Sequence, residues 1–265
     1  MSVRKLWSKV QGRWESGICR LTSRKQVRYQ LEHPVVSFTF DDFPASAYHA
    51  GGRILEQNEM RGTYYTALGL MGSENLLGEH FSREDLHELH EHGHELACHT
   101  YSHHTCAEQS PTQFVQDIER NAELFALEFP DVSLEAFSFP KGVLKPLHHR
   151  PVAKRFRCLR TVAPGVNRGN INLNYILAIR LYESQIDATL VDRLITDLER
   201  QPGWIVFYTH DVRTNPSQYG TTPGLLESTV ARVARSSAKV LTVSDAVNWI
   251  GEGRRSEQST AAVCP

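Results

Sequence analysis

The sequence predicts an α/β protein with a parallel β-sheet, built either as a βα barrel or as a doubly wound sheet. Seven short apolar runs, rich in β-branched and aromatic residues, have the length of buried strands. Segments with helical periodicity separate most of these runs, and such alternation is typical of parallel sheets. The chain has 265 residues, which is enough for one domain of either architecture.

The predicted strands are bounded by charged or turn-forming residues. They cover residues 35–40, 62–67, 94–99, 135–139, 157–162, 204–209 and 239–243. The stretch 175–182 is predicted to be another strand or an irregular segment.

Helices are predicted at residues 48–58, 83–92, 111–128, 188–200, 223–236 and 244–250. Ser82 with Asp85 is a plausible helix start, and so is Ser110 before Pro111. Gly93 falls where the second of these helices should end.

Composition and charge exclude several classes of protein. No apolar run reaches the roughly 18 residues that a membrane-spanning helix needs. The five cysteines form no C-x-x-C pair. These thiols and the lack of a secretory signal pattern predict a cytoplasmic protein. Residues 1–30 carry a net charge of +7 and the remainder −8. The acidic body argues against nucleic-acid binding.

The domain organisation predicted is a basic N-terminal extension over residues 1–33, a catalytic barrel over 34–252 and a polar tail over 253–265. In residues 3–21, apolar side chains recur every three or four positions among basic ones, which indicates an amphipathic helix. This helix either contacts an anionic membrane peripherally or packs on the barrel with its charges in solvent.

Ionisable residues follow three of the predicted strands. Asp41 and Asp42 follow the first strand, His99 and His103 the third, and His210 the sixth. The carboxyl ends of parallel strands form one edge of the sheet, so these five side chains should lie close together. Little that ionises is expected at the ends of the second, fifth and seventh strands.

The histidine spacing favours a metal site. One helical turn after the third strand would place His99 and His103 on the same side. A carboxylate from another strand would complete a two-histidine, one-carboxylate set with open positions for water. A zinc ion there would polarise a carbonyl group and lower the pKa of its water to about 7. A free carboxylate and a separate histidine could then move protons.

A second histidine pattern is expected to be structural. His90 and His94 match the H-E-x-x-H pattern, but that metal motif needs both residues on one continuous helix. Gly93 is predicted to end the helix between them.

Four segments resemble, in the same order, motifs of the polysaccharide deacetylase family, also called carbohydrate esterase family 4 or the NodB-homology domain. The segments are Ser37–Asp42, His99–His103, Phe137–Gly142 and Tyr208–His210. The resemblance implies a distorted (β/α) barrel of about seven parallel strands, similar to NodB. It also implies metal-dependent removal of acetyl groups, usually from N-acetylated sugars.

The resemblance implies a role for each of the five ionisable residues. Asp41 would be the general base and His210 the general acid. Asp42, His99 and His103 would bind the metal ion, most often zinc, with cobalt, nickel or manganese as alternatives.

The third and fourth motifs both depart from the family pattern. The backbone N–H of Lys141, after Pro140, would hold the oxyanion, but Lys141 replaces an aromatic residue. Ser138 stands where many members have the arginine that orients the base. Residues 132–186 contain no Asp to tune the acid histidine. Arg180, in a stretch that resembles another family segment, is a candidate to support the site.

The sequence therefore predicts a metal-dependent hydrolase that removes an N-acetyl group from a sugar, in polysaccharide, oligosaccharide or glycolipid assembly. Its expected partners are an N-acetylated sugar or glycan and, through residues 3–21, a membrane surface, with no nucleic acid. Two alternatives stay open. One is hydrolysis of another non-peptide C–N bond, such as a cyclic amide or ureide. The other is a carbohydrate-binding homologue that has lost catalysis.

Overall fold

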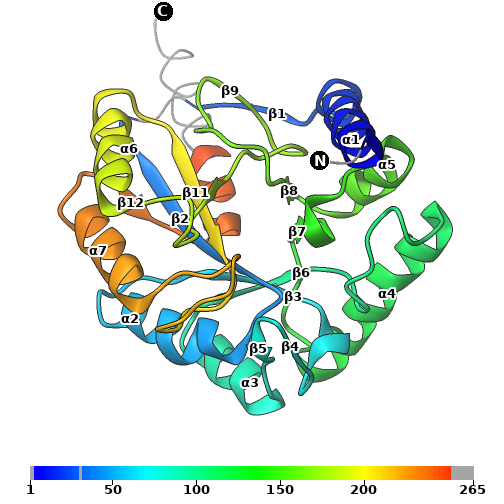
Figure 1. The fold of residues 1–265 in the computed structure, drawn as a ribbon, viewed down its shortest axis with the longest axis horizontal. Coiled ribbons are helices and arrows are strands. Elements are labelled where there is room, and N and C mark those ends of the chain that lie inside the picture. The colour runs from blue at the N-terminus through cyan, green and yellow to red at the C-terminus, as the bar shows by residue number, and fades with distance from the viewer. Residues whose placement is uncertain (1–2, 30–31, 252–265) are drawn as a thin grey trace, which may run out of the picture.

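The fold is a distorted barrel built around one parallel sheet, as the sequence predicts (Figure 1). The computed structural model describes residues 3–29 and 32–251, so the predicted tail 253–265 lies outside the described residues. The sheet order is β10-β11-β2-β3-β6-β7-β8, and β12 pairs with the start of β2. The strands are β2 (Val35–Asp41), β3 (Thr63–Thr66), β6 (Glu95–Cys98), β7 (Ala136–Ser138), β8 (Cys158–Arg160), β10 (Ile179–Arg180), β11 (Trp204–Thr209) and β12 (Lys239–Val240).

One irregular segment links the two outer strands of this sheet. Residues 173–178 run beside β8, where the Leu159 N–H donates to the carbonyl of Leu173 and the Ile176 N–H donates to the carbonyl of Leu159. The same segment continues into β10, which pairs with β11. The predicted stretch 175–182 is therefore partly irregular and partly a short strand.

Helices cover the outside of the sheet (Figure 1). They are α1 (Val3–Thr22), the π-helical η1 (Ala47–Gly52) with α2 (Arg53–Glu56), α3 (Arg83–Glu91), α4 (Pro111–Glu128), α5 (Pro146–Arg155), α6 (Ala188–Arg200) and α7 (Pro223–Ala234). A last helix over 243–251 instead packs its apolar residues against the inside of the barrel (Figure 1). Both predicted starts are correct, because Ser82 and Ser110 each form a capping box. The sequence analysis missed α5, which carries Pro151 in its interior.

Smaller elements fill the ends of the barrel. An antiparallel pair joins β1 (Gln26–Arg28) to β9 (Asn170–Asn172), and β4 (Glu74–Asn75) forms a hairpin with β5 (Gly78–Glu79). Short 3₁₀ turns lie at Leu68–Leu70 (η2) and Pro140–Gly142 (η3).

The core explains why the apolar runs form strands. All seven residues of β2 are buried, and so are all six of β11. One apolar cluster lies between the sheet and helices α2, α3, α6 and α7, and a second lies inside the barrel. Burial on both faces is typical of parallel strands, and it holds the residues at the strand ends rigidly.

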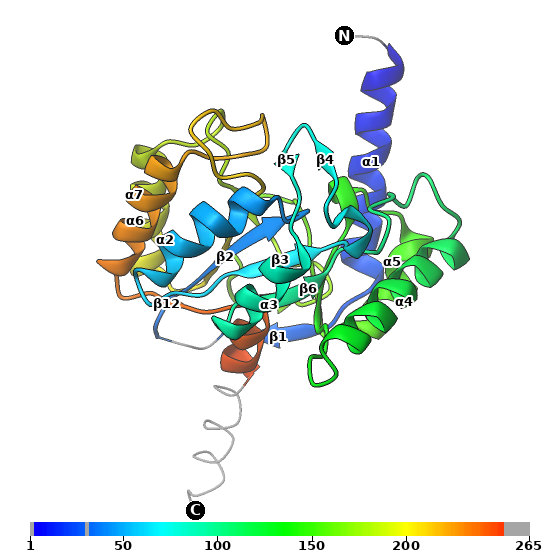
Figure 2. The ribbon, with the colours of Figure 1, turned by 90° about the horizontal axis from the view of Figure 1, so that it is seen from below.

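Helix α1 stands at the edge of the body (Figure 2). Its C-terminal half packs near α5, with Cys19 buried and the Ser16 hydroxyl hydrogen-bonded to the Tyr175 hydroxyl. None of the described helices combines the length and the apolar character needed to cross a membrane.

Candidate active site

The end of β2 sends two neighbouring carboxylates in different directions. Asp41 is the last residue of the strand, in register with Tyr65 of β3. Asp42 and Phe43 then adopt φ values of 62° and 53°, which turn the chain sharply. Both carboxylates are almost fully buried. Asp41 pairs with Arg160 of β8, and Asp42 faces two imidazoles.

The imidazoles of His99 and His103 converge on the Asp42 carboxylate. Asp42 Oδ1 lies 2.9 Å from His103 Nε2 and 3.2 Å from His99 Nε2. His99 Nδ1 lies 2.8 Å from the carbonyl oxygen of Ser138. Because a carbonyl oxygen only accepts hydrogen bonds, Nδ1 carries the proton and donates it. That hydrogen bond fixes the ring and leaves the Nε2 lone pair directed at Asp42.

The loop that carries the two histidines differs from the predicted helical turn. Residues 99–104 contain no helix, and Thr100 and His103 have φ values of 63° and 58°. The N–H of His103 donates to the Thr100 hydroxyl at 3.1 Å, and Asp117 of α4 accepts hydrogen bonds from Ser102. The prediction of a helical turn is wrong, because local side-chain hydrogen bonds stabilise a tighter loop. The two rings still lie together, with centroids 5.1 Å apart.

The donor set of Asp42, His99 and His103 fits a divalent transition metal. One ligand atom from each residue lies within 4.8 Å of the others, and this is the one such group among the described residues. Asp42 Oδ1 is buried without a well-aligned hydrogen bond, as a carboxylate poised to bind a cation would be. Two imidazoles and one carboxylate are a common set for zinc, cobalt and iron.

Electrostatics keeps the Asp42 carboxylate ionised. Burial raises its pKa, but the facing rings of His103 and His99 outweigh that effect. The net result is a pKa held well below the ordinary value for Asp, to which the more distant His210 also contributes.

Arg160 is a site residue that the sequence analysis missed. It is fully buried at the end of β8, opposite Ser138 in the register of β7 with β8. Its guanidinium forms an ion pair with Asp41 and lies between two aromatic rings, 4.8 Å from the centroid of Tyr65 and 4.8 Å from that of Tyr208. The expectation that little ionises at the end of the fifth predicted strand is therefore wrong.

This arginine occupies the place next to the expected one. Ser138 stands where the resemblance leads us to expect an arginine, and no described residue forms a hydrogen bond with its buried hydroxyl. Arg160 reaches Asp41 from the adjacent strand at the same level. The signal in the sequence was a charged residue inside an apolar run, because a buried arginine needs a partner.

His210 follows β11 and lies at the edge of the site. Its Nδ1 lies 3.2 Å from the carbonyl oxygen of Tyr219, which accepts the Nδ1 proton. The adjacent Asp211 is fully buried and faces away, where it binds Ser217 and forms an ion pair with Arg213. The sequence analysis found no Asp to pair with His210, and in the structure the backbone carbonyl of Tyr219 is its hydrogen-bond partner.

The turn after β7 presents a free backbone donor. Lys141 has φ 55° and ψ 15° within η3, and its side chain is exposed. Within the described part of the chain, no residue accepts a hydrogen bond from its N–H. Pro140, which precedes it, is buried and holds the turn in place.

Arg180 lies in β10, at the other side of the barrel. Its Nε donates to the hydroxyl of Tyr208 at 2.7 Å, and the Tyr208 ring lies against Arg160. Arg180 therefore contacts the network of Asp41 through one tyrosine and makes no direct contact with either aspartate.

Two histidines outside the cluster have structural roles. His80 Nδ1 donates to the carbonyl oxygen of Asp42 at 3.1 Å and supports the turn after β2. Helix α3 ends at Glu91, one residue before the predicted end at 92 and before Gly93. The buried His94 instead accepts a hydrogen bond from the Gly62 N–H and contacts Glu56. The H-E-x-x-H pattern is thus divided between a helix and a strand start.

Comparison with known proteins finds one matching family model and several solved structures with a similar fold. Residues 28–155 match the family model described as polysaccharide deacetylase. Among curated protein sequences, none matches the chain significantly. Solved structures share the fold.

Peptidoglycan deacetylase PdaC from Bacillus subtilis superimposes with a TM-score of 0.57 at 14% identity, over 88% of this chain and 98% of that chain. A family 4 acetyl xylan esterase from Clostridium thermocellum, in complex with a cobalt ion, gives 0.56 at 16% identity, over 80% and 89%. A family 4 carbohydrate esterase from Streptomyces lividans, in complex with acetate, gives 0.52 at 17% identity, over 78% and 91%.

Over residues 28–155 the chain matches the polysaccharide deacetylase family model, in agreement with the motif order. Its fold is shared with solved deacetylases and esterases of carbohydrate esterase family 4.

Proposed function

We propose that the protein is a metal-dependent hydrolase that removes N-acetyl groups from a sugar or glycan. The observation that supports this most strongly is the separation of the two adjacent carboxylates. Asp42 faces His99 and His103, whereas Asp41 pairs with Arg160. One carboxylate is thus available to bind a metal ion and the other to take a proton.

Asp42, His99 and His103 would hold the metal ion, with zinc expected first and cobalt, nickel or manganese as alternatives. When bound there, a divalent ion supplies Lewis acidity that polarises the acetyl carbonyl and acidifies water. The hydrogen bond from His99 Nδ1 to the Ser138 carbonyl keeps the ligand nitrogen facing the site.

Asp41 is proposed as the general base that takes the proton of the attacking water. Arg160 would act as a positioning residue, since its ion pair with Asp41 fixes the orientation of the carboxylate. The Lys141 N–H would donate to the oxyanion that develops on the acetyl group, a position where one donor contributes about 3 kcal/mol in other hydrolases.

His210 is proposed as the general acid for the departing amine. Because Nδ1 donates to the Tyr219 carbonyl, a proton on Nε2 is the one free to move to the leaving nitrogen. Arg180, which contacts Tyr208, would support the network at one remove.

The domain limits, the cytoplasmic location and the membrane contact remain predictions. We propose that the catalytic barrel spans residues 34–252 and that residues 1–33 form an attached extension. In support, the first strand of the parallel sheet along the chain, β2, begins at Val35, and the last described helix covers residues 243–251.

The experiment compares metal content and acetate release from N-acetylated chito-oligosaccharides. The wild type is expected to bind about one metal ion per chain and release acetate. Asp41→Asn should retain the metal and lose turnover, and the double variant His99→Ala/His103→Ala should lose both. His104→Ala, at the exposed neighbouring histidine, is the control and should retain both.

Other outcomes would identify the alternatives. Metal binding without acetate release, together with hydrolysis of a cyclic amide or ureide, would favour the other C–N bonds. A protein that takes up no added metal and binds glycans without hydrolysis would be a carbohydrate-binding homologue. An Asp41→Asn variant that keeps its metal and full activity would contradict the role of Asp41 as the base.

A further inference from the structure

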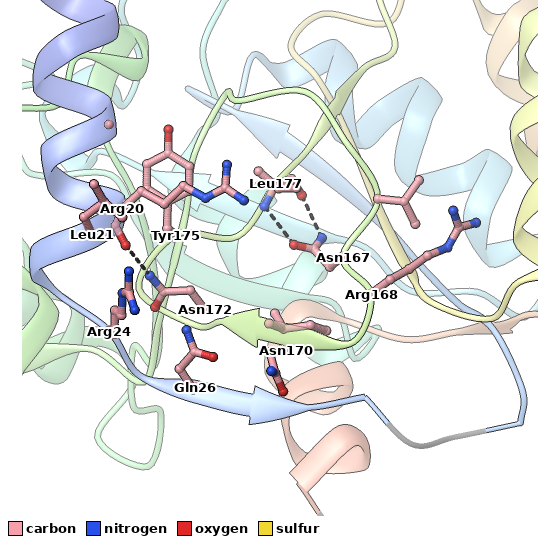
Figure 3. Close-up of a pocket in the computed structure, with 13 residues that line it drawn as sticks. Arg20, Leu21, Arg24, Gln26, Asn167, Arg168, Asn170, Asn172, Tyr175 and Leu177 are labelled. Carbon is pink, nitrogen blue, oxygen red and sulfur yellow. Dashed lines mark hydrogen bonds between the residues drawn. The ribbon is translucent and has the colours of Figure 1, made fainter.

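A second surface feature lies away from the candidate active site. An open pocket of about 610 Å³ lies between the C-terminal end of α1 and the β1–β9 pair, a size typical of ligand pockets (Figure 3). None of the proposed catalytic or metal-binding residues lines it. Its polar lining includes Arg20, Arg24, Arg168, Asn170 and Tyr175.

The charge of this pocket is one-sided. Of the described residues that line it, three are arginines and none is Asp or Glu. Arg168 is engaged, because its guanidinium binds the Asp197 carboxylate at 2.7 Å and the Gln201 carbonyl at 2.9 Å. Arg20 lies over the ring of Tyr175, 5.9 Å from the centroid.

Arg20 and Arg24 are thus the uncompensated charges of the pocket. Neither forms an ion pair with any residue that the structure describes. Both are exposed, and they extend from the end of α1 and the turn after it (Figure 3). Guanidinium groups bind phosphate oxygens well, since their N–H donors match the geometry of the anion.

An exposed apolar stripe on α1 adjoins the pocket. Trp14, Ile18 and Leu21 are 73%, 40% and 63% exposed, respectively. Their spacing of four and three residues places them on one face of the helix, and Leu21 also lines the pocket. An exposed tryptophan and two aliphatic residues beside arginines form the pattern of a helix that lies in a membrane interface.

We propose that this surface docks on an anionic phospholipid membrane. The phosphate of a lipid headgroup would bind at Arg20 and Arg24, while Trp14, Ile18 and Leu21 enter the boundary between headgroups and acyl chains. The apolar stripe favours a lipid over a soluble phosphate compound, because a soluble compound would leave it in water.

The charge distribution also favours a membrane as the partner. Residues 1–30 carry +7 and the remaining residues −8. An anionic surface therefore attracts the α1 end of the molecule and repels the body. The view in Figure 2 places α1 at the edge of the body, where such a surface can reach it.

Vesicle co-sedimentation tests the proposal on the full chain. Vesicles of phosphatidylcholine with phosphatidylglycerol are compared with phosphatidylcholine alone, at low and high salt. The wild type should bind only the anionic vesicles and should release them at high salt. Arg20→Glu/Arg24→Glu should weaken binding at least about tenfold, and Trp14→Ala should weaken it as well. The control Arg193→Glu/Arg235→Glu makes the same charge change at two exposed arginines, one on α6 and one directly after α7.

Four results would overturn the proposal. Equal binding to both vesicle types would exclude headgroup recognition. If the control variant loses as much vesicle binding as Arg20→Glu/Arg24→Glu, the net charge of the protein alone would explain the effect. Saturable binding of inorganic phosphate that needs Arg20 and Arg24, without vesicle binding, would identify a soluble anion site. A dimer that Trp14→Ala dissociates, without vesicle binding, would mean that a second copy covers the stripe. Circular dichroism confirms that each variant is folded.

Discussion

Replacing Arg160 by methionine tests whether this arginine orients the proposed base. Methionine keeps much of the side chain's length and apolar contact but removes the charge. The change leaves Asp41 buried without its partner and puts an uncharged side chain between the rings of Tyr65 and Tyr208, where the guanidinium lay. We therefore expect two separate effects, one on stability and one on kcat.

The magnitude of the stability effect depends on how deeply the pair is buried. The side chains of Arg160 and Asp41 are 0% and 6% exposed, and removing one partner of such a pair costs about 3–5 kcal/mol. Asp41→Asn should cost less, about 2 kcal/mol, because Arg160 keeps both aromatic contacts. The double variant should then cost about as much as Arg160→Met alone, a coupling energy of about 2 kcal/mol.

Urea denaturation measures these free energies of unfolding at neutral pH. Arg157→Met is the matched control, because Arg157 lies just before the same strand but pairs with the half-exposed Glu135. Its cost should stay below about 1 kcal/mol. If the double variant instead costs the sum of the two single variants, Arg160 and Asp41 do not act as a pair.

Acetate release at several substrate concentrations measures the second effect. Without Arg160 the Asp41 carboxylate is no longer held in place, so kcat should fall at least about tenfold in Arg160→Met while KM changes little. A purely structural arginine would change stability and leave kcat in place. An unchanged kcat in a folded variant would therefore refute the positioning role.

Further predictions concern one histidine and two turns. Burial lowers the pKa of His94 to about 4. Its folded form therefore resists protonation, and stability should fall as the pH drops from about 6.5 to about 4. His94→Gln should flatten this dependence in urea denaturation, and an unchanged slope would assign it to other groups. Asp211→Ala should lower kcat about tenfold or more, because it loosens the loop that places the Tyr219 carbonyl against His210; full activity would mean that the loop holds without it. Lys141→Gly keeps the backbone N–H, so acetate release should stay within about twofold, whereas a large loss would show that the side chain acts.

The elements that the sequence predicted well are those that local patterns determine. The bounds of α4, α6 and β11 agree with the prediction, since each combines a clear period with a recognisable start or end. Helix α5 was missed because Pro146 and Pro151 and a weak apolar pattern argue against a helix locally. Packing against α1 and α4 compensates for this.

The residues of the site were predictable only where they follow strands whose carboxyl ends meet at the same edge of the sheet. Asp42, His99 and His103 follow their strands directly, so topology alone brings them together. Arg160 is separated from Asp41 by 119 residues, and its role depends on the position of β8 in the closed barrel. The conformation of residues 99–104 also depended on contacts from α4, which no local spacing encodes.

The positive φ values at the site have a consequence for engineering. Six non-glycine residues of the described chain have such values, and five of them lie in the turns after β2, β6 and β7. Each left-handed residue costs about 1 kcal/mol of stability relative to glycine. These turns therefore lower the stability of the fold by several kcal/mol at the positions of the proposed metal ligands and of the Lys141 N–H. Selection for heat resistance alone would tend to replace these residues, and so would trade activity for stability at the same positions.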